Sequence, residues 1–405
     1  MDIKSESRLT FLEATGIIVG HGVGSGILSV PFLASRNTIW DFMWIIAVAF
    51  FLNVLLHLMI AELSYNNKGL QFVKCMEATI FKGKLKKALT IITFAFLGLS
   101  VLANCCSYIT GSANVLMELL NLPRAICVLI YYVFSGIVVF FGMKIVGICE
   151  KYSLFIMLIV MAVLTIATFT INLSPLPIKF YSASNIMALY GMVSFALSSV
   201  MSVPTVVKGL NGDVKKIRGS IILGIGVNIF MIVLLTFITL LGSGTDISQN
   251  GAIYDLSLSI GGWIKYIGYI FTLFALSTSL WTNTLNLRDM IHEQTNMGLK
   301  ISWIIASLPC LVLALINFSS FVGFARIASI IQVLTGLAII VAYSISRNEE
   351  MKNTKENTEF SENGLKVIDK YKGSPICRVF GAIPFQILVV LSSIIATVGS
   401  ILPIV

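Results

Sequence analysis

Four glycines and one histidine gather in a single apolar stretch, GHGVGSGILSVP, which runs from Gly20 to Pro31. Gly22, Gly24 and Gly26 follow at every second position, and residues two apart point in different directions on a helix. Close helix packing explains Gly20 and Gly24, which are four residues apart, but it does not explain this alternation. We therefore predict a helix break whose free backbone groups line a cavity, the setting in which a membrane tolerates unwound backbone.

A broken helix offers the two opposite charges that an amino-acid zwitterion needs. The N-terminal end of a half-helix attracts a carboxylate, and the carbonyls at the C-terminal end of the other half attract an ammonium group. Gly24, Ser25 and Gly26 are the candidates for the carboxylate, and the carbonyls near Gly20 and His21 and those of Phe195 to Ser198 for the ammonium. Tyr108 would cover the site or bind the carboxylate, although pairing with another buried neighbour explains its hydroxyl equally well.

A second disrupted stretch, YGMVSFALSSVMSVPTVVKG from Tyr190 to Gly209, contains four serines and a proline. Serine also bonds to its own helix without breaking it, so ordinary serine packing is an equal alternative here. Two disrupted segments in matching places of two halves are nevertheless the best sequence indication of a midplane binding site. The predicted substrate-binding residues are Gly22, Gly24, Ser25, Gly26, Tyr108, Phe195, Ala196, Ser198 and Ser199.

The composition indicates which elements must position these residues. Of the 405 residues, 57% are hydrophobic and 12% are charged, about half the charged fraction of a soluble protein. The apolar stretches reach the length of about 20 residues that crosses a bilayer, and backbone in lipid must be helical. We predict an all-α integral membrane protein with eleven transmembrane helices, at residues 10–36, 40–65, 88–120, 124–143, 151–173, 185–207, 219–242, 258–291, 301–317, 321–346 and 380–404.

Lysine and arginine divide unequally between the predicted loops. With the N-terminus inside, 23 of the 28 lie in inside segments and 4 lie outside, which is the positive-inside distribution. We therefore expect a multi-pass cell (plasma) membrane protein with a cytoplasmic N-terminus and an extracytoplasmic C-terminus. The remaining cation, Arg326, falls inside the tenth helix, where it should face a cavity or pair with an acid.

The run VGSGILSVPF (Val23 to Phe32) resembles the helix 1 signature of the amino acid/auxin permease family, within the amino acid–polyamine–organocation superfamily. The AELS segment that ends helix 2 and the helix 6 segment beginning at Ser194 are similar as well. The resemblance implies a LeuT-type fold of two inverted five-helix repeats with broken helices 1 and 6, plus one extra helix. Ser198 and Ser199 stand where the family commonly has small glycines, which leaves the substrate size open.

On this scheme residues 1–405 form a single transmembrane transporter domain. The first repeat covers 10–173, the second covers 185–346, a cytoplasmic linker covers 347–379, and the eleventh helix is 380–404. The chain has no nucleotide-binding motif, which argues against a primary pump. Its seven cysteines lack metal-binding spacing and indicate packing residues.

Predicted helix 8 contains ALSTSLWTNTLNLRD, whose many hydroxyls suit Na⁺ together with helix 1 carbonyls. In the superfamily, helix 8 hydroxyls that face helix 1 form such a site. The resemblance therefore implies a Na⁺ site made by Gly20, His21, Ser277, Thr278 and Ser279. Hydroxyls on membrane helices also often bond only to their own backbone.

The choice between Na⁺ and H⁺ depends on helix 5 and on His21. Some proton-coupled relatives have a lysine in the middle of helix 5, whereas the predicted helix 5 has Lys151 only at its start, which favours Na⁺. His21 keeps H⁺ open, because imidazole changes charge near neutral pH, although a neutral histidine with one hydrogen bond is the simpler alternative.

Glu13, Glu62 and Glu118 are predicted to lie near helix ends, and no acid lies at mid-depth in helices 1, 6 or 8. A cationic substrate would want a buried carboxylate, so a neutral amino acid is favoured.

The predicted function is a symporter that imports neutral amino acids by alternating access, coupled to Na⁺ or H⁺. The expected partners are the amino acid, the coupling ion and the bilayer, without nucleic acid or any other cofactor, and the protein is expected to be a monomer. The alternative is an amino-acid-binding nutrient sensor without net transport, for which the short linker offers little docking surface. No nucleophile–base pair or metal cluster stands out, so an enzyme is not expected.

Overall fold

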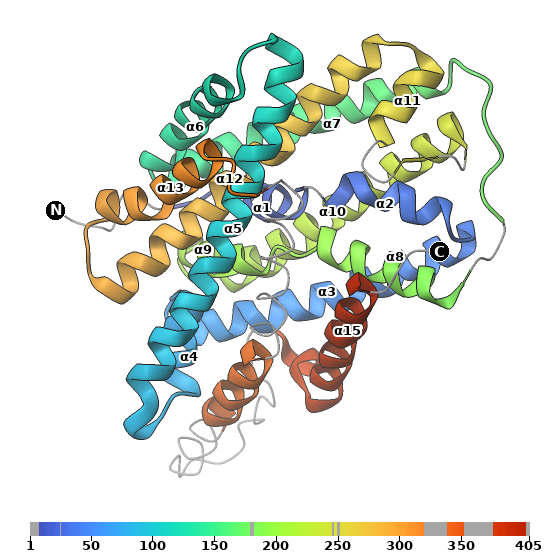
Figure 1. Ribbon diagram of the computed structural model, residues 1–405. Coiled ribbons are helices and arrows are strands. Elements are labelled where there is room, and N and C mark those ends of the chain that lie inside the picture. The colour runs from blue at the N-terminus through green and yellow to red at the C-terminus, as the bar shows by residue number, and fades with distance from the viewer. Residues whose placement is uncertain are drawn as a thin grey trace.

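The structure is a computed structural model that describes residues 8–24, 26–178, 182–244, 247–248, 252–319, 338–351 and 376–401. Throughout these ranges the regular structure is helical (Figure 1). The helices are α1 (Phe11–Gly22), α2 (Gly26–Ser35), α3 (Ile39–Asn66), α4 (Phe72–Thr79), α5 (Lys86–Leu120), α6 (Arg124–Phe140), α7 (Met143–Thr168), α8 (Ala183–Ala196), α9 (Val203–Gly209), α10 (Val214–Ser243), α11 (Ala252–Ile260), α12 (Trp263–Thr295), α13 (Leu299–Leu315) and α15 (Ile383–Ile401), with 3₁₀ turns η1 (Gly83–Leu85), η2 (Val200–Ser202) and η3 (Arg378–Gly381). Residues 338–351 are helical as well.

Five of the described helices are long and apolar enough to cross a membrane, and the bent pair of α1 and α2 makes a sixth. Shorter apolar helices are α6, α13 and residues 383–399 of α15. Most of the helix expected at 321–346, and Arg326 with it, lies outside the described residues. The chain is therefore a multi-pass helical protein, and the count of eleven stays a prediction.

Both predicted helix breaks are present. Helix α1 ends at Gly22, and α2 starts at Gly26 at an angle of 55° to it. The sixth predicted helix is divided into α8 and α9, with the 3₁₀ turn η2 between them. Pro204 lies in the first turn of α9, a position where its missing N–H costs nothing.

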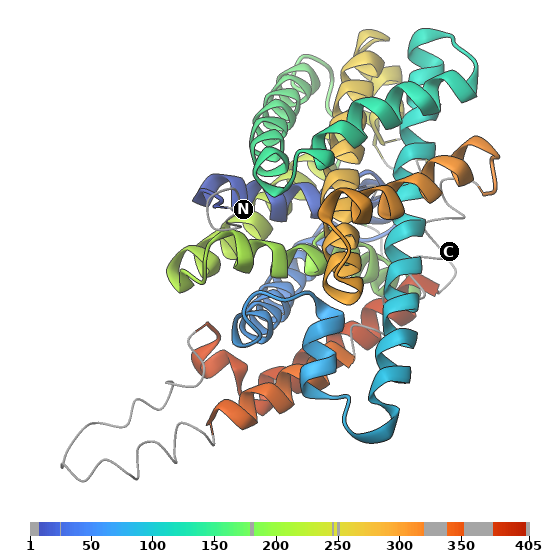
Figure 2. The ribbon, with the colours of Figure 1, turned by 90° about the vertical axis from the view of Figure 1, so that its left-hand side faces the viewer.

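Helix α1 lies at the centre of the bundle, and α7, α10, α12 and α9 pack around it. Every residue of α1 from Glu13 to Gly22 is buried, as expected for a helix enclosed on all sides. Gly16 permits this packing, because a Cβ atom there would lie 2.9 Å from the backbone nitrogen of Lys151 on α7. Figure 2 shows α5 along one edge of the bundle.

The prediction for helix 5 was wrong at its start. It placed the helix at 151–173, but α7 begins at Met143 and ends at Thr168. Gly142 precedes it with a positive φ of 93°, a conformation that glycine adopts without steric cost. Glu150 and Lys151 therefore lie two turns inside the helix, where the sequence interpretation had a loop and a helix start.

The C-terminal helix α15 packs against α8 and α3 (Figure 1). The segment before α15 is held against α3 by the buried Glu62, which accepts hydrogen bonds from the backbone N–H groups of Ile376 (3.2 Å) and Cys377 (2.8 Å). The hydroxyl of Tyr343, in the helical segment 338–351, also donates to Glu62 at 3.0 Å. Because that segment continues to residue 351, the predicted linker of 347–379 starts too early.

Candidate functional site

The two helix breaks meet at the start of α2. A Cβ atom on Gly26 would lie 3.0 Å from both Cα and Cβ of Ala196, and 3.1 Å from the ring of Phe195. The N-terminal end of α2 therefore lies against the C-terminal end of α8, which glycine alone allows at this distance. The structure thus brings together three of the predicted substrate-binding residues.

Gly24 faces a small polar group. A Cβ atom there would lie 3.0 Å from Oγ of Ser279 on α12 and 3.6 Å from the hydroxyl of Tyr108 on α5. Tyr108 is buried, so its ring closes one side of this space and its hydroxyl faces the break. Ser25, between Gly24 and Gly26, lies outside the described residues.

Three predicted residues remain, Gly22, Ser198 and Ser199, and the two serines extend the α8 break toward α1 and α3. The backbone N–H of Ser198 donates to the carbonyl of Phe195 at 3.0 Å. The hydroxyl of Ser199 donates to the carbonyl of Ile18 at 2.6 Å. A Cβ atom added to Gly22 would lie 2.9 Å from the same hydroxyl oxygen. Ser199 therefore joins the two broken helices to each other.

The residues predicted to hold an ion are only partly brought together. The hydroxyl of Ser279 donates to the carbonyl of Gly20 at 3.0 Å. Thr278 packs against Gly20, because a Cβ atom added to Gly20 would lie 2.8 Å from the Cβ of Thr278. Ser277 instead pairs with the hydroxyl of Tyr131 on α6 at 3.1 Å. His21 pairs through Nδ1 with Oγ of Ser202 at 2.8 Å, so it faces η2 and not the helix 8 hydroxyls.

His57 on α3 is a positioning residue that sequence reasoning left aside. Its Nε2 accepts the backbone N–H of Ser199 at 2.8 Å, and its Nδ1 lies 2.7 Å from the carbonyl of Asn53. A backbone N–H can only donate, so Nε2 carries no hydrogen and Nδ1–H donates to Asn53. The neutral ring thus satisfies a backbone group that the α8 break sets free. Helical spacing gave no sign of this contact.

We expect His57→Ala to lower the free energy of unfolding by about 1–3 kcal/mol, because the buried N–H of Ser199 would lose its acceptor. Thermal or denaturant unfolding of the purified protein measures this. His292→Ala is the matched control, since the His292 ring also bonds to a carbonyl, that of Met297, but at an exposed position. Equal losses in the two variants would contradict the positioning role.

Glu150 is the second residue that the sequence interpretation missed. Its side chain is fully buried, and a Cβ atom on Gly20 would collide with its Oε2 atom. The carboxyl group therefore lies beside α1 at the level of the break, next to Thr278. The signal that could have found it is the glycine at 142, which marks an earlier helix start.

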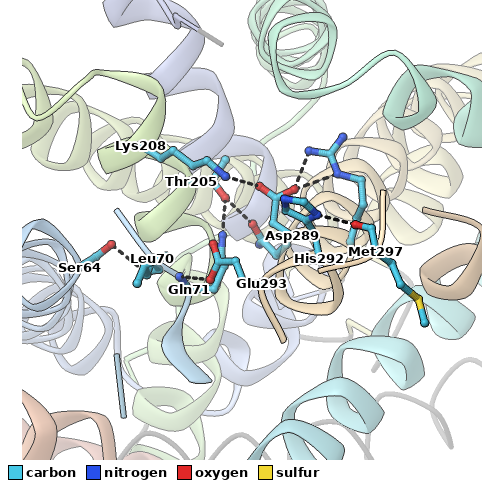
Figure 3. Close-up of polar contacts among 11 residues, drawn as sticks. Ser64, Leu70, Gln71, Thr205, Lys208, Asp289, His292, Glu293 and Met297 are labelled. Atoms are coloured by element: carbon cyan, nitrogen blue, oxygen red, sulfur yellow. Dashed lines mark hydrogen bonds and ion pairs between the residues drawn. The ribbon is translucent and has the colours of Figure 1, made fainter. Parts of the chain in front are cut away.

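A polar network joins α9, α12 and the segment before α4 on the predicted cytoplasmic side of the breaks (Figure 3). Asp289 on α12 pairs with Arg288 at 2.6 Å and with Lys208 of α9 at 3.5 Å. The backbone N–H of Gln71, which precedes α4, donates to Glu293 at 2.9 Å. We call these residues the inner network.

The inner network is continuous with the break. Thr205 donates to the side chain of Asn286 at 2.8 Å, and Asn286 donates to Ser202 at 3.1 Å, the residue that pairs with His21. The side-chain amide of Gln71 donates to Thr205 at 3.2 Å (Figure 3). Helices α9 and α12 and the start of α4 are thus held together below the site.

A central buried helix that is broken at Gly22 and lies against a second broken helix is the architecture of membrane transporters of the broken-helix class. Residues 7–360 match the family model described as the tryptophan/tyrosine permease family. The chain belongs to the tryptophan/tyrosine permease family. The resemblance to the amino acid/auxin permeases stays a prediction, and no curated protein sequence matches the chain.

Solved transporters share the fold. MhsT in complex with L-phenylalanine is 12% identical, with a TM-score of 0.69 over 98% of this chain and 99% of that one. Mhp1, a nucleobase-cation-symport-1 family transporter in a closed conformation with bromovinylhydantoin bound, is 13% identical, with a TM-score of 0.64 over 97% and 91%. The manganese transporter of Eremococcus coleocola is 13% identical, with a TM-score of 0.56 over 98% and 90%. The predicted LeuT-type fold is confirmed, and the family and these neighbours indicate a transporter, not an enzyme.

Proposed function

We propose that this protein is a symporter that imports a neutral aromatic amino acid by alternating access. The observation that carries the proposal is the contact of the two helix breaks, where Gly26 at the start of α2 lies against Ala196 at the end of α8. A helix start has a partial positive charge and a helix end a partial negative charge. One zwitterion placed there would direct its carboxylate to α2 and its ammonium to α8.

The aromatic substrate class is supported by the side chains at this junction. Phe195 contacts the start of α2, and the ring of Tyr108 closes the space beside Gly24. Aromatic rings pack well against one another at centroid separations of about 4.5–7 Å. The name of the tryptophan/tyrosine permease family and the L-phenylalanine bound to MhsT favour the same class.

The coupling cation is proposed to bind beside Gly20, where Thr278 and the hydroxyl of Ser279 approach α1. Na⁺ was favoured from the sequence because predicted helix 5 had a lysine only at its start, Lys151. In the structure α7 begins at Met143, so Glu150 and Lys151 lie inside the helix, and the carboxyl group of Glu150 lies beside Gly20. Na⁺ and H⁺ are therefore both to be tested.

The test is uptake by the purified protein in liposomes. We expect tryptophan, tyrosine and phenylalanine to accumulate when a cation gradient is imposed and to raise the melting temperature, since a ligand at 100 times its Kd adds about 2.7 kcal/mol. Lysine and glutamate serve as controls. Accumulation of no aromatic amino acid under either a Na⁺ or a pH gradient would refute the proposal, and binding without flux would favour the nutrient sensor.

A further inference from the structure

A pair of buried asparagines lies at one level of the bundle, on α5 and on α12. Asn104 of α5 directly precedes Cys105, and Asn283 of α12 directly precedes Thr284. The Sγ atom of Cys105 lies 3.6 Å from Oγ1 of Thr284 across the two helices. The two asparagines therefore lie at the same height, and only 5% of Asn104 and none of Asn283 is exposed.

On α5, Asn104 is turned toward the first helix break. It lies one turn before Tyr108, and residues four apart share a helix face. The Tyr108 hydroxyl faces Gly24, where an added Cβ atom would lie 3.6 Å from it. Asn104 therefore faces the break from one turn nearer the predicted cytoplasmic side.

On α12, Asn283 lies between two residues that bond to the broken helices. Four residues before it, Ser279 donates to the carbonyl of Gly20 at 3.0 Å. Three residues after it, Asn286 donates to Ser202 at 3.1 Å. These spacings keep all three side chains on one face of the helix. The two asparagines thus lie between the proposed substrate site and the inner network.

The side-chain amides of this pair are incompletely bonded. Nδ2 of Asn283 donates to the carbonyl of Ser279 at 2.8 Å, but its buried Oδ1 accepts no hydrogen bond within the described part of the chain. The backbone carbonyl of Asn104 accepts the hydroxyl of Ser107 at 2.9 Å, whereas its side-chain amide has no partner among the described residues. Buried polar groups are nearly always paired, so a donor from outside the chain, a ligand or a water, is needed at Oδ1.

The ring of an aromatic amino acid can supply this donor. With the carboxylate at the start of α2 and the ammonium at the end of α8, the ring fills the space beside them. The phenol hydroxyl of tyrosine donates and accepts, and the indole N–H of tryptophan donates. Either donor satisfies Oδ1 of Asn283, and the phenol oxygen also accepts from the amide of Asn104. Phenylalanine has no such group and would leave both amides unpaired.

We propose that Asn104 and Asn283 are specificity-determining residues that bind the hydrogen-bonding group on the substrate's ring. They select tyrosine and tryptophan over phenylalanine. This inference rests on the proposed function, because it concerns which members of the aromatic class the same site accepts.

Binding to the wild-type protein tests the selectivity without any substitution. Calorimetric titration of the purified protein compares tyrosine with para-fluorophenylalanine, and tryptophan with the analogue in which sulfur replaces the indole N–H. The members of each pair have nearly the same shape, but only the natural amino acid has a ring donor. Each analogue should bind at least about tenfold more weakly, because it leaves a buried acceptor unpaired. Equal measurable affinities within either pair would overturn the inference.

Leucine substitutions test the two residues themselves. Asn104→Leu and Asn283→Leu should each weaken the binding of tyrosine but not that of para-fluorophenylalanine, so the preference shrinks in each variant and disappears when both are combined. Asn114→Leu is the matched control, since Asn114 is an exposed residue of the same helix α5 that bonds to Arg124 at 3.2 Å. It should keep the wild-type preference. If the two leucine variants weaken both ligands equally, the asparagines only support the fold or hold water, and the inference is wrong.

Failure of this inference is distinguishable from failure of the proposed function. If the wild type binds no aromatic amino acid, both fail. If it binds tyrosine and para-fluorophenylalanine equally, the proposed function stands and only the role of the asparagines fails. Should a leucine variant not fold, the smaller Asn104→Ala and Asn283→Ala take its place in the same comparison, with the same expected loss of preference.

Discussion

Gly24→Leu is expected to abolish amino-acid binding while the protein still folds. The Cβ of the new side chain would lie 3.0 Å from Oγ of Ser279 and 3.6 Å from the Tyr108 hydroxyl, so the rest of the leucine would fill the proposed carboxylate site. We expect the affinity to fall at least about a hundredfold, a loss of ~2.8 kcal/mol. Thermal stabilisation by tryptophan, tyrosine and phenylalanine measures the effect.

The control is a glycine at a position with space around it. Gly226 on α10 has no atom within 4 Å of an added Cβ, so Gly226→Leu makes the same chemical change in a membrane helix away from the site. It should keep wild-type affinity. If Gly24→Leu also keeps its affinity, the space between Gly24, Tyr108 and Ser279 does not hold the substrate.

Asp289→Asn should open the inner network. The carboxylate of Asp289 accepts two hydrogen bonds from Arg288, at 2.9 and 2.6 Å, and pairs with Lys208. Arg288 is only 5% exposed, so the variant leaves a buried charge without its partner, which typically costs about 3–5 kcal/mol. Helices α9 and α12 should then separate, and the protein should shift toward a conformation open to the predicted cytoplasmic side.

Cys75 on α4 reports this opening. Burial, together with the nearby Glu293, raises the pKa of the Cys75 thiol to about 12, and only the thiolate reacts with alkylating reagents. At pH 8 the closed protein should therefore resist alkylation. When water reaches the thiol, its pKa should fall toward the ordinary value of about 8.5, and the reactive fraction at pH 8 should rise by roughly a thousandfold.

Mass spectrometry after a timed exposure to a maleimide measures the modified fraction of Cys75. Asp213→Asn is the matched control, because Asp213 also pairs with a lysine, Lys216, but on the surface. It should leave the labelling rate of Cys75 unchanged. Slow labelling of Cys75 in Asp289→Asn, equal to that of wild type, would show that this ion pair does not hold the inner side closed.

Local features of the sequence predicted the larger part of the fold. The glycine alternation from Gly22 to Gly26 predicted the first break, since backbone strain and helix propensity are properties of neighbouring residues. For the second segment the sequence left a break and ordinary serine packing as equal alternatives, because serine can also bond to its own helix without breaking it. In the structure this break involves His57, a residue about 140 positions away whose Nε2 accepts the N–H of Ser199.

The residues of the proposed site lie together only in part, and the reason is geometric. Gly24, Gly26, Tyr108, Phe195 and Ala196 come together as their places on helices 1, 3 and 6 suggested. Ser277 and His21 were grouped with the ion site by sequence proximity, yet they point to Tyr131 and Ser202. Adjacent residues on a helix face directions about 100° apart, so neighbours in sequence need not share a site.

The sequence by itself therefore determined the class of protein, its helical character and the place of the first break, since composition, length and glycine spacing act locally. Tertiary structure decided which of the polar residues meet. Glu150 shows the difference most clearly. Its helix start was misplaced by eight residues, and the meaning of its carboxyl group comes from Gly20 and Thr278, which approach it only when α1, α7 and α12 pack together.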